Sequence, residues 1–181
     1  HVLRPPTGEW TAVTGTTRFE PALGRGVSAA TLSDADGPFA VASCSNLPYG
    51  YFNAYAAIAR RADLDAVIHL GDYLYEYANG TFGDGTAFDR VPQPNAEIVT
   101  LSDYRTRHAQ YKADLDLQEA HRQHPFIVVW DDHETTNDAW RDGAENHQPE
   151  EGDFEARKAA AIQAYFEWMP IRASRRNPEG Q

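Results

Sequence analysis

Two apolar, strand-like runs of this sequence end in acidic residues, and this pattern constrains the fold more than any other feature. Residues 66–70 (Ala-Val-Ile-His-Leu) lead into Gly71 and Asp72, and residues 126–130 (Phe-Ile-Val-Val-Trp) lead into Asp131. In open parallel sheets, sites form at the carboxyl ends of the strands. Two strands that end in metal-ligand residues therefore predict one shared site, with metal-assisted hydrolysis as its chemistry rather than simple binding.

The composition narrows the class of protein further. The chain has 181 residues, enough for one domain with a real core, and 41% of them are hydrophobic. No apolar run approaches the ~20 residues of a membrane span. The net charge of −11, without a basic block, argues against nucleic-acid binding. An acidic chain that handles phosphate needs cations to offset the repulsion, which fits a metal site.

The two ends of the chain predict a piece of a longer protein. It begins at His1 with no visible signal peptide, and the polar stretch 174–181 stops without a terminating element. Residues 1–37 are rich in Gly, Pro, Thr and Ser, so we expect the end of a preceding β-domain or a linker there.

The central part of the chain has the pattern of a βαβ unit. A strand at 38–44, a helix at 50–62 and a strand at 65–70 predict parallel neighbours in an α/β fold. The loop at 79–99 is long enough to be functional or mobile. The other expected elements are a helix from Thr100 or Ser102 to about 112, a helix capped by Asp114 to about 123, a strand at 126–130 too apolar to be exposed, a polar loop at 135–150, and a helix at 154–168 that begins at Asp153.

Asp72 and the acidic run after residue 130 are the first candidate site residues. Gly71 permits a tight turn and a close approach of the backbone, and Asp72 can hold a cation or simply cap a turn. The run Asp131-Asp132-His133-Glu134 can bind metal or move protons, with Asn137 and Asp138 just beyond. The alternative is a solvated loop with one structural histidine. His133 is the natural general acid, because its pKa lies near neutrality.

Cys44 and Tyr75 are the second pair of candidates. Cys44 ends the first strand at the same edge as Asp72, and a thiolate beside a carboxylate suits iron or zinc better than calcium. It could equally be a small buried hydrophobe, or a nucleophile with His133 as base, although carboxylates raise a thiol pKa. Tyr75 shares a face with Asp72 if a helical turn follows the strand. It is either a ligand of ferric iron or a core aromatic.

Several of these segments together resemble a known family, the PhoD-type alkaline phosphatases of the calcineurin-like metallophosphoesterases. The resemblance covers roughly residues 38–170, in order. It rests on residues 42–44 (Ala-Ser-Cys), 50–55 (Gly-Tyr-Phe-Asn-Ala-Tyr), 68–76 (Ile-His-Leu-Gly-Asp-Tyr-Leu-Tyr-Glu), 104–108 (Tyr-Arg-Thr-Arg-His) and 130–134 (Trp-Asp-Asp-His-Glu).

The resemblance implies a metallophosphoesterase-type β-sandwich flanked by helices, incomplete in this chain, with 38–181 as the N-terminal part of the catalytic domain. It implies iron (Fe³⁺) with calcium (Ca²⁺), and hydrolysis of phosphomonoesters and phosphodiesters. The implied metal ligands are Cys44, Asp72 as the bridge, Tyr75, and Asp132 or Asn137, and the implied catalytic residues are His133 and Asp132. A secreted, periplasmic or cell-wall location is also implied.

The expected mechanism is attack of a metal-bound hydroxide on phosphorus, with His133 protonating the leaving oxygen. The resemblance also implies later Asp and His ligands that these 181 residues lack, so the missing C-terminal part would be a partner of this chain. Two other hypotheses remain: a non-catalytic fragment or scaffold without the second half of the site, and a cysteine-nucleophile hydrolase.

Overall fold

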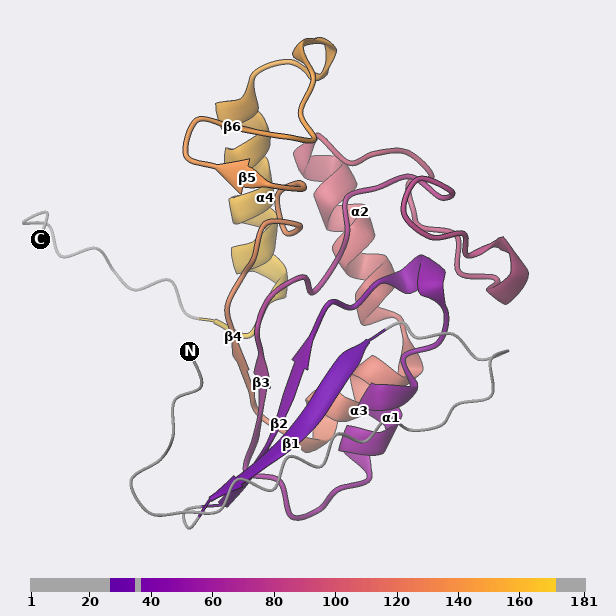
Figure 1. Cartoon of the computed structure of the whole chain (residues 1–181), viewed down its shortest axis with the longest axis vertical. Coiled ribbons are helices and arrows are strands. Elements are labelled where there is room, and N and C mark those ends of the chain that lie inside the picture. Colours follow the sequence, from indigo (N-terminus) through magenta and orange to yellow (C-terminus); the bar gives the residue numbers. More distant parts are fainter. Residues whose placement is uncertain (1–26, 35–36, 172–181) are drawn as a thin grey trace, which may run out of the picture.

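A four-stranded mixed sheet forms the frame of the molecule (Figure 1). The computed structural model describes residues 27–34 and 37–171. The strands are β1 (Ser28–Asp34), β2 (Gly37–Ser43), β3 (Ala66–His69) and β4 (Phe126–Val128), side by side in that order. β1 is antiparallel to β2, whereas β2, β3 and β4 are parallel. The α/β class is thus confirmed, and three carboxyl strand ends meet at one edge.

The predicted βαβ unit is present as β2, α1 (Asn53–Ala59) and β3. The parallel register pairs Val41 with Ile68, and Ile68 with Ile127 of β4. The helix is shorter than the predicted span of 50–62. Gly50 has a φ of 123°, outside the helical region, so the helix starts only at Asn53.

The three longer helices begin where the capping residues predict. α2 (Leu101–Lys112) has Thr100 as its cap, in a reciprocal capping box with Asp103. In α3 (Leu115–Gln123) the side chain of Asp114 accepts from the Leu117 amide, and in α4 (Phe154–Trp168) Asp153 accepts from the Ala156 amide. Local sequence therefore fixed these boundaries, and Thr100 rather than Ser102 is the cap of α2.

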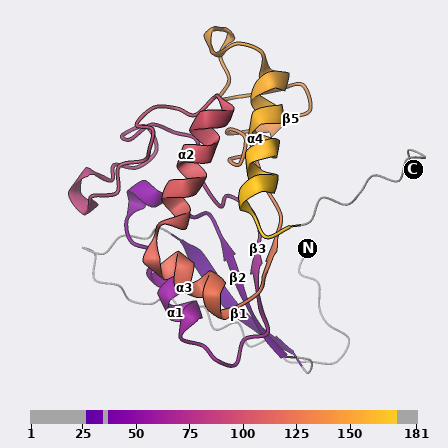
Figure 2. The same ribbon diagram turned by 180° about the vertical axis from the view of Figure 1, so that it is seen from behind.

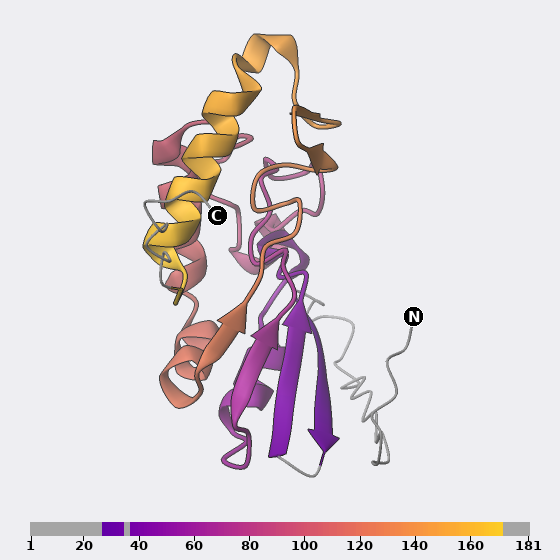
Figure 3. The same cartoon turned by 90° about the vertical axis from the view of Figure 1, so that its left-hand side faces the viewer.

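α1 and α3 lie over one face of the sheet, whereas α2 and α4 extend beyond the carboxyl ends of the strands, as Figures 2 and 3 show from behind and from the side. α1 packs on α3, and α2 on α4. The prediction that the last strand is too apolar to be exposed is wrong for its other face: Ile127 is 58% exposed and Val129 is 51% exposed, while Phe126 is buried. The reason is that the described helices leave the opposite face of the sheet uncovered.

The predicted polar loop at 135–150 contains a small hairpin of β5 (Ala139–Trp140) and β6 (Gly143–Ala144). Short 3-10 helices lie at Leu47–Tyr49, Thr86–Phe88 and Pro149–Glu151. Among the described helices, none has the length and apolar character required to span a bilayer.

A buried arginine holds the long loop that follows β3. Arg107 of α2 is only 1% exposed and donates to backbone carbonyls along the loop. The acceptors are those of Tyr75, Tyr77 at 3.1 Å, Gln93 at 3.0 Å, Pro94 at 3.0 Å and Ala96 at 3.1 Å. Of the two alternatives for this loop, functional or mobile, the anchoring favours a fixed conformation.

β1 lies within the stretch 1–37, which the sequence assigns to a preceding domain or linker. It nevertheless pairs along its length with β2, from Ser28 opposite Ser43 to Asp34 opposite Gly37. Residues 1–26 lie outside the described part of the chain. The division at residue 38 therefore stays a prediction.

Candidate metal centre

The ends of β2 and β3 are joined by backbone hydrogen bonds just beyond the sheet. The amide of Cys44 donates to the carbonyl of Gly71 at 3.2 Å, and that of Ser45 to the carbonyl of Asp72 at 2.8 Å. Cys44 and Asp72 both adopt the left-handed conformation, with φ of 58° and 53°. Such strained positions outside glycine cluster at functional sites. The two predicted ligands are therefore fixed side by side.

Gly71 is required by a close approach between two loops. A Cβ atom built on it would lie 2.5 Å from the Asp131 amide nitrogen and 2.6 Å from the Asp131 Cβ atom, and its φ is 104°. A larger residue would push the Asp72 loop away from the Asp131 loop. The close backbone approach expected at Gly71 is what brings the two strand ends together.

Asp72 is the centre of a cluster of metal-ligand side chains. Its Oδ2 atom accepts from the Cys44 thiol at 3.5 Å and from the Tyr75 hydroxyl at 3.1 Å. Its Oδ1 atom is buried and has no hydrogen-bond partner. Burial raises the pKa of Asp72 above its ordinary value. A buried carboxylate oxygen without a partner is costly, and a cation would remove that cost.

Tyr75 reaches Asp72 by a route other than the predicted helical turn. No helix follows β3; the chain bends after Gly71 and continues without regular structure. The left-handed φ of Asp72 prevents a helical continuation but still turns the Tyr75 hydroxyl back toward the carboxylate. Burial and then the Asp72 charge raise the Tyr75 pKa, so without a cation this side chain is a phenol.

Asp132 and His133 complete the cluster from the loop after β4. One donor atom from each of Asp72, Asp132 and His133 lies within 4.8 Å of the others. Asn137 is oriented differently, because its side-chain amide donates to Glu145 at 3.0 Å. The conformation groups Asp132 with Asp72, and the choice between Asp132 and Asn137 as the direct ligand stays open.

His133 is held by Glu76, a residue that the sequence reading did not single out. The Nδ1 atom of His133 donates to Glu76 at 2.8 Å, and Glu76 is fully buried. Burial lowers the pKa of His133, but the hydrogen bond and charge of Glu76 outweigh it, so the net shift is upward. Glu76 also accepts from the Asn137 amide and from the Asn146 side chain. In the sequence, the only sign of a role for Glu76 is that it is a single acidic residue directly after the apolar residues 73–75.

Glu134, a predicted ligand or proton carrier, is instead bound to the backbone of both loops. Its carboxylate accepts from the amides of Tyr73 at 2.6 Å, Asp131 at 2.8 Å and Asp72 at 3.1 Å. Burial raises its pKa to about 7, against the lowering effect of these donors. Glu134 therefore acts as a clamp between the Asp72 loop and the Asp131 loop.

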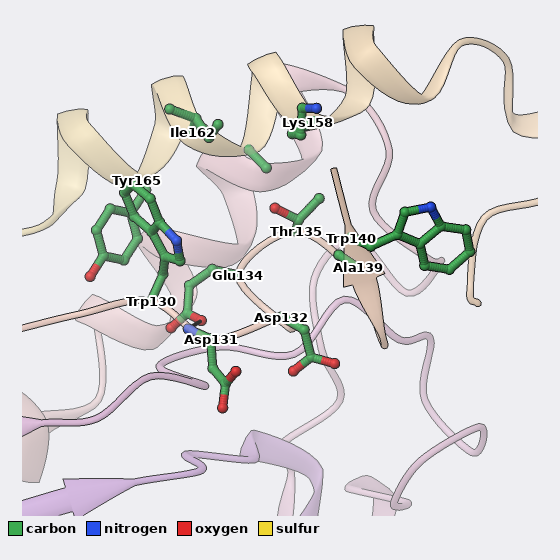
Figure 4. Close-up of a pocket in the computed structure, with 11 residues that line it drawn as sticks. Trp130, Asp131, Asp132, Glu134, Thr135, Ala139, Trp140, Lys158, Ile162 and Tyr165 are labelled. Carbon is green, nitrogen blue, oxygen red and sulfur yellow. Dashed lines mark hydrogen bonds between the residues drawn. The ribbon is translucent and has the colours of Figure 1, made fainter. Parts of the chain in front are cut away.

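A cavity of about 410 Å³ opens on the α4 side of the acidic loop (Figure 4). In Figure 4 the carboxylates of Asp131 and Asp132 point away from α4. Asp132 lines the cavity and also belongs to the cluster, whereas Asp72 and His133 do not line the cavity. The lining residues include Trp130, Trp140, Lys158 and Tyr165.

The donor set fits metal binding. It combines a thiol, a phenol, two carboxylates and an imidazole around a buried oxygen that has no partner. Sulfur and phenol favour a transition metal, and carboxylates also suit a hard cation. With its place at the carboxyl edge of parallel strands, the cluster defines a candidate metal-dependent hydrolase site.

Comparison with known proteins gives the family. The sequence model of the PhoD-like phosphatases matches residues 39–181. The chain is 44% identical over 174 residues to alkaline phosphatase D of Bacillus subtilis (strain 168), which is 96% of this chain and 28% of that protein. This chain belongs to the PhoD-like phosphatase family.

A solved structure described as "Structure of PhoD" has the same fold. It matches with a TM-score of 0.65 and 38% sequence identity, over 81% of this chain and 31% of the solved chain. The chain thus spans less than a third of the length of either relative.

Proposed function

We propose that this chain forms one side of a two-metal site that hydrolyses phosphomonoesters and phosphodiesters. The observation that carries the proposal is the buried, unpartnered Oδ1 atom of Asp72, surrounded by further metal-ligand groups in a member of a phosphatase family. The family resemblance extends the proposal to a secreted, periplasmic or cell-wall location.

The cluster divides into two sets of ligands. Cys44 and Tyr75 would hold iron, Asp132 would hold calcium, and Asp72 would bridge the two. Asn137 is the alternative to Asp132, since only its amide nitrogen is bound to Glu145. The cations, when bound, would supply the acidity that makes hydroxide available near neutral pH and the positive charge that balances the phosphoryl oxygens.

His133 is the proposed proton donor to the leaving oxygen. Glu76 occupies its Nδ1 atom, which leaves Nε2 to face the substrate. The upward shift of the His133 pKa favours the protonated imidazole that a general acid requires. Asp132 supports it by adding negative charge beside the ring.

The geometry does not favour Cys44 as a nucleophile. Its thiol donates to Asp72, and burial followed by the Asp72 charge raises its pKa, so little thiolate is present. The hydrogen bond of the thiol goes to a carboxylate rather than to the His133 imidazole, whose Nδ1 atom is bound to Glu76.

Substitution of the central carboxylate tests the proposal. In the full-length protein, Asp72→Asn should lower hydrolysis of p-nitrophenyl phosphate by about a thousandfold or more, because the bridging charge is lost. Asp63→Asn, at an exposed carboxylate paired with Arg61, is the matched control and should keep the wild-type rate. A wild-type rate for Asp72→Asn would refute the assignment.

A further inference from the structure

Phe82 lies at the centre of a cluster of aromatic rings beside the proposed proton donor. Its ring centroid is 5.4 Å from Tyr49, 5.5 Å from Tyr77 and 5.7 Å from Tyr75. It is also 6.4 Å from the ring of His133, with only 14° between the two planes. These contacts join the tip of the long loop to the candidate metal centre, and neither the metal site nor the fold requires them.

The backbone holds Phe82 in this position. The amide of Gly80 donates to the carbonyl of Gly83 at 2.8 Å, and the side chain of Asn46 donates to the carbonyl of Phe82 at 3.3 Å. Gly83 has a φ of 94°, and a Cβ atom there would lie 3.1 Å from the Tyr49 ring. The turn is therefore pressed against Tyr49, which fixes the aromatic rings before any ligand arrives.

In the part of the chain that the structure describes, the outer rings of this cluster are open to solvent. Phe82 is 41% exposed and Tyr49 is 43% exposed, whereas Tyr75 and His133 beneath them are almost completely buried. Fixed, exposed aromatic surface next to a polar site is typical of ligand-binding surfaces. Phe82 and Tyr49 together are called the aromatic platform below.

The position of the platform determines which part of a substrate would contact it. The leaving oxygen must lie within hydrogen-bonding reach of His133, so the carbon skeleton attached to that oxygen extends over the neighbouring surface. The cavity on the α4 side is a less suitable place, because His133 is not among the residues that line it, whereas the Phe82 ring lies 6.4 Å from the His133 ring.

We propose that the aromatic platform binds the leaving group of the substrate and selects phosphate esters whose alcohol carries a planar aromatic ring. The ring would stack on Phe82, with Tyr49 at its edge, since aromatic pairs favour offset-stacked and edge-to-face contacts. This inference rests on the proposed phosphoesterase function and adds a substrate class to it.

A matched pair of esters tests the platform in the full-length enzyme. Phe82→Ala should raise the KM for phenyl phosphate by about tenfold, in line with the loss of one stacking contact. The KM for glycerol 2-phosphate should change by less than about twofold, since that alcohol has no ring to stack. Phe82→Trp should restore the phenyl phosphate KM, and metal content should equal that of wild type throughout.

Phe88→Ala is the matched control, because Phe88 belongs to the same loop but contacts Tyr51 instead. It should leave both KM values unchanged. An equal change in KM for the two esters with Phe82→Ala, or a loss of metal that slows both, would show that Phe82 only covers Tyr75, and the platform would be rejected while the phosphoesterase function stands. Failure of the wild-type enzyme to hydrolyse either ester would instead overturn both proposals.

Discussion

Glu76 and Glu134 differ from Asp72 in how their buried oxygens are satisfied. Glu134 accepts hydrogen bonds from three backbone amides. Glu76 accepts hydrogen bonds from the His133 ring and from the Asn137 amide. Asp72 is nearly as buried, yet one of its oxygens has no partner. Carboxylates with a full set of partners hold loops and side chains in place, whereas the unpartnered oxygen of Asp72 supports the proposed metal site.

The three residues therefore have separable roles around one centre. Glu134 joins the two strand-end loops, Glu76 holds His133, and Asp72 is the proposed metal ligand. Substitutions should affect stability, turnover and metal binding, respectively. The following predictions test this separation, from the largest expected effect to the smallest.

Glu134→Ala should have the largest effect on stability. Two buried amides and a partly buried one would lose their acceptor, so we expect the free energy of unfolding to fall by about 3 kcal/mol. Urea denaturation at pH 8 measures this. Glu150→Ala, at an exposed acid, is the control and should change stability little. If Glu134→Ala lowered the free energy of unfolding by less than Glu150→Ala, Glu134 would not be a clamp between the two loops.

Glu76→Gln should lower turnover while leaving metal in place. Gln keeps the size of the side chain but weakens its bond to His133, so we expect kcat to fall by about 10- to 100-fold. Elemental analysis should give the wild-type metal content. Loss of metal together with activity would contradict a role confined to orienting His133.

His108 shows that an unpartnered buried atom is not by itself a metal site. Neither ring nitrogen has a hydrogen-bond partner, and the ring stacks on Trp168, away from the strand ends. Burial lowers its pKa to about 3, so the folded state keeps it neutral while the unfolded state gains a proton below its ordinary pKa. The contribution of His108 to the free energy of unfolding should therefore be complete above its ordinary pKa and decline as the pH falls below that pKa.

The expected contribution of His108 is small but measurable. When the pH falls from 7.5 to 6.0, His108 should lower the free energy of unfolding by about 0.8 kcal/mol, a value calculated for one histidine with an unfolded-state pKa of ~6.5. His108→Phe should remove this part of the pH dependence in urea denaturation curves. An unchanged slope would mean that His108 is protonated in the folded state or accessible to water.

Local sequence was sufficient for the elements and for the edge at which the cluster forms. Thr100, Asp114 and Asp153 mark helix starts because capping depends on residues three positions apart. Cys44 and Asp72 were placed together because parallel strands align their carboxyl ends.

The supporting contacts could not be obtained in the same way. Glu76 meets His133 across 57 positions, and Arg107 binds carbonyls up to 32 positions away, so both depend on the assembled fold. The exposure of Ile127 was missed for a related reason, since an apolar strand does not reveal which of its faces has a neighbour.

Anomalous diffraction from crystals of the full-length protein tests the central claim most directly. We predict a peak at the iron edge about 2.0–2.6 Å from an oxygen of Asp72, the range of metal–oxygen bonds, with Cys44 and Tyr75 also within bonding distance. An occupied metal site elsewhere in the protein, with Asp72 still unligated, would contradict the account.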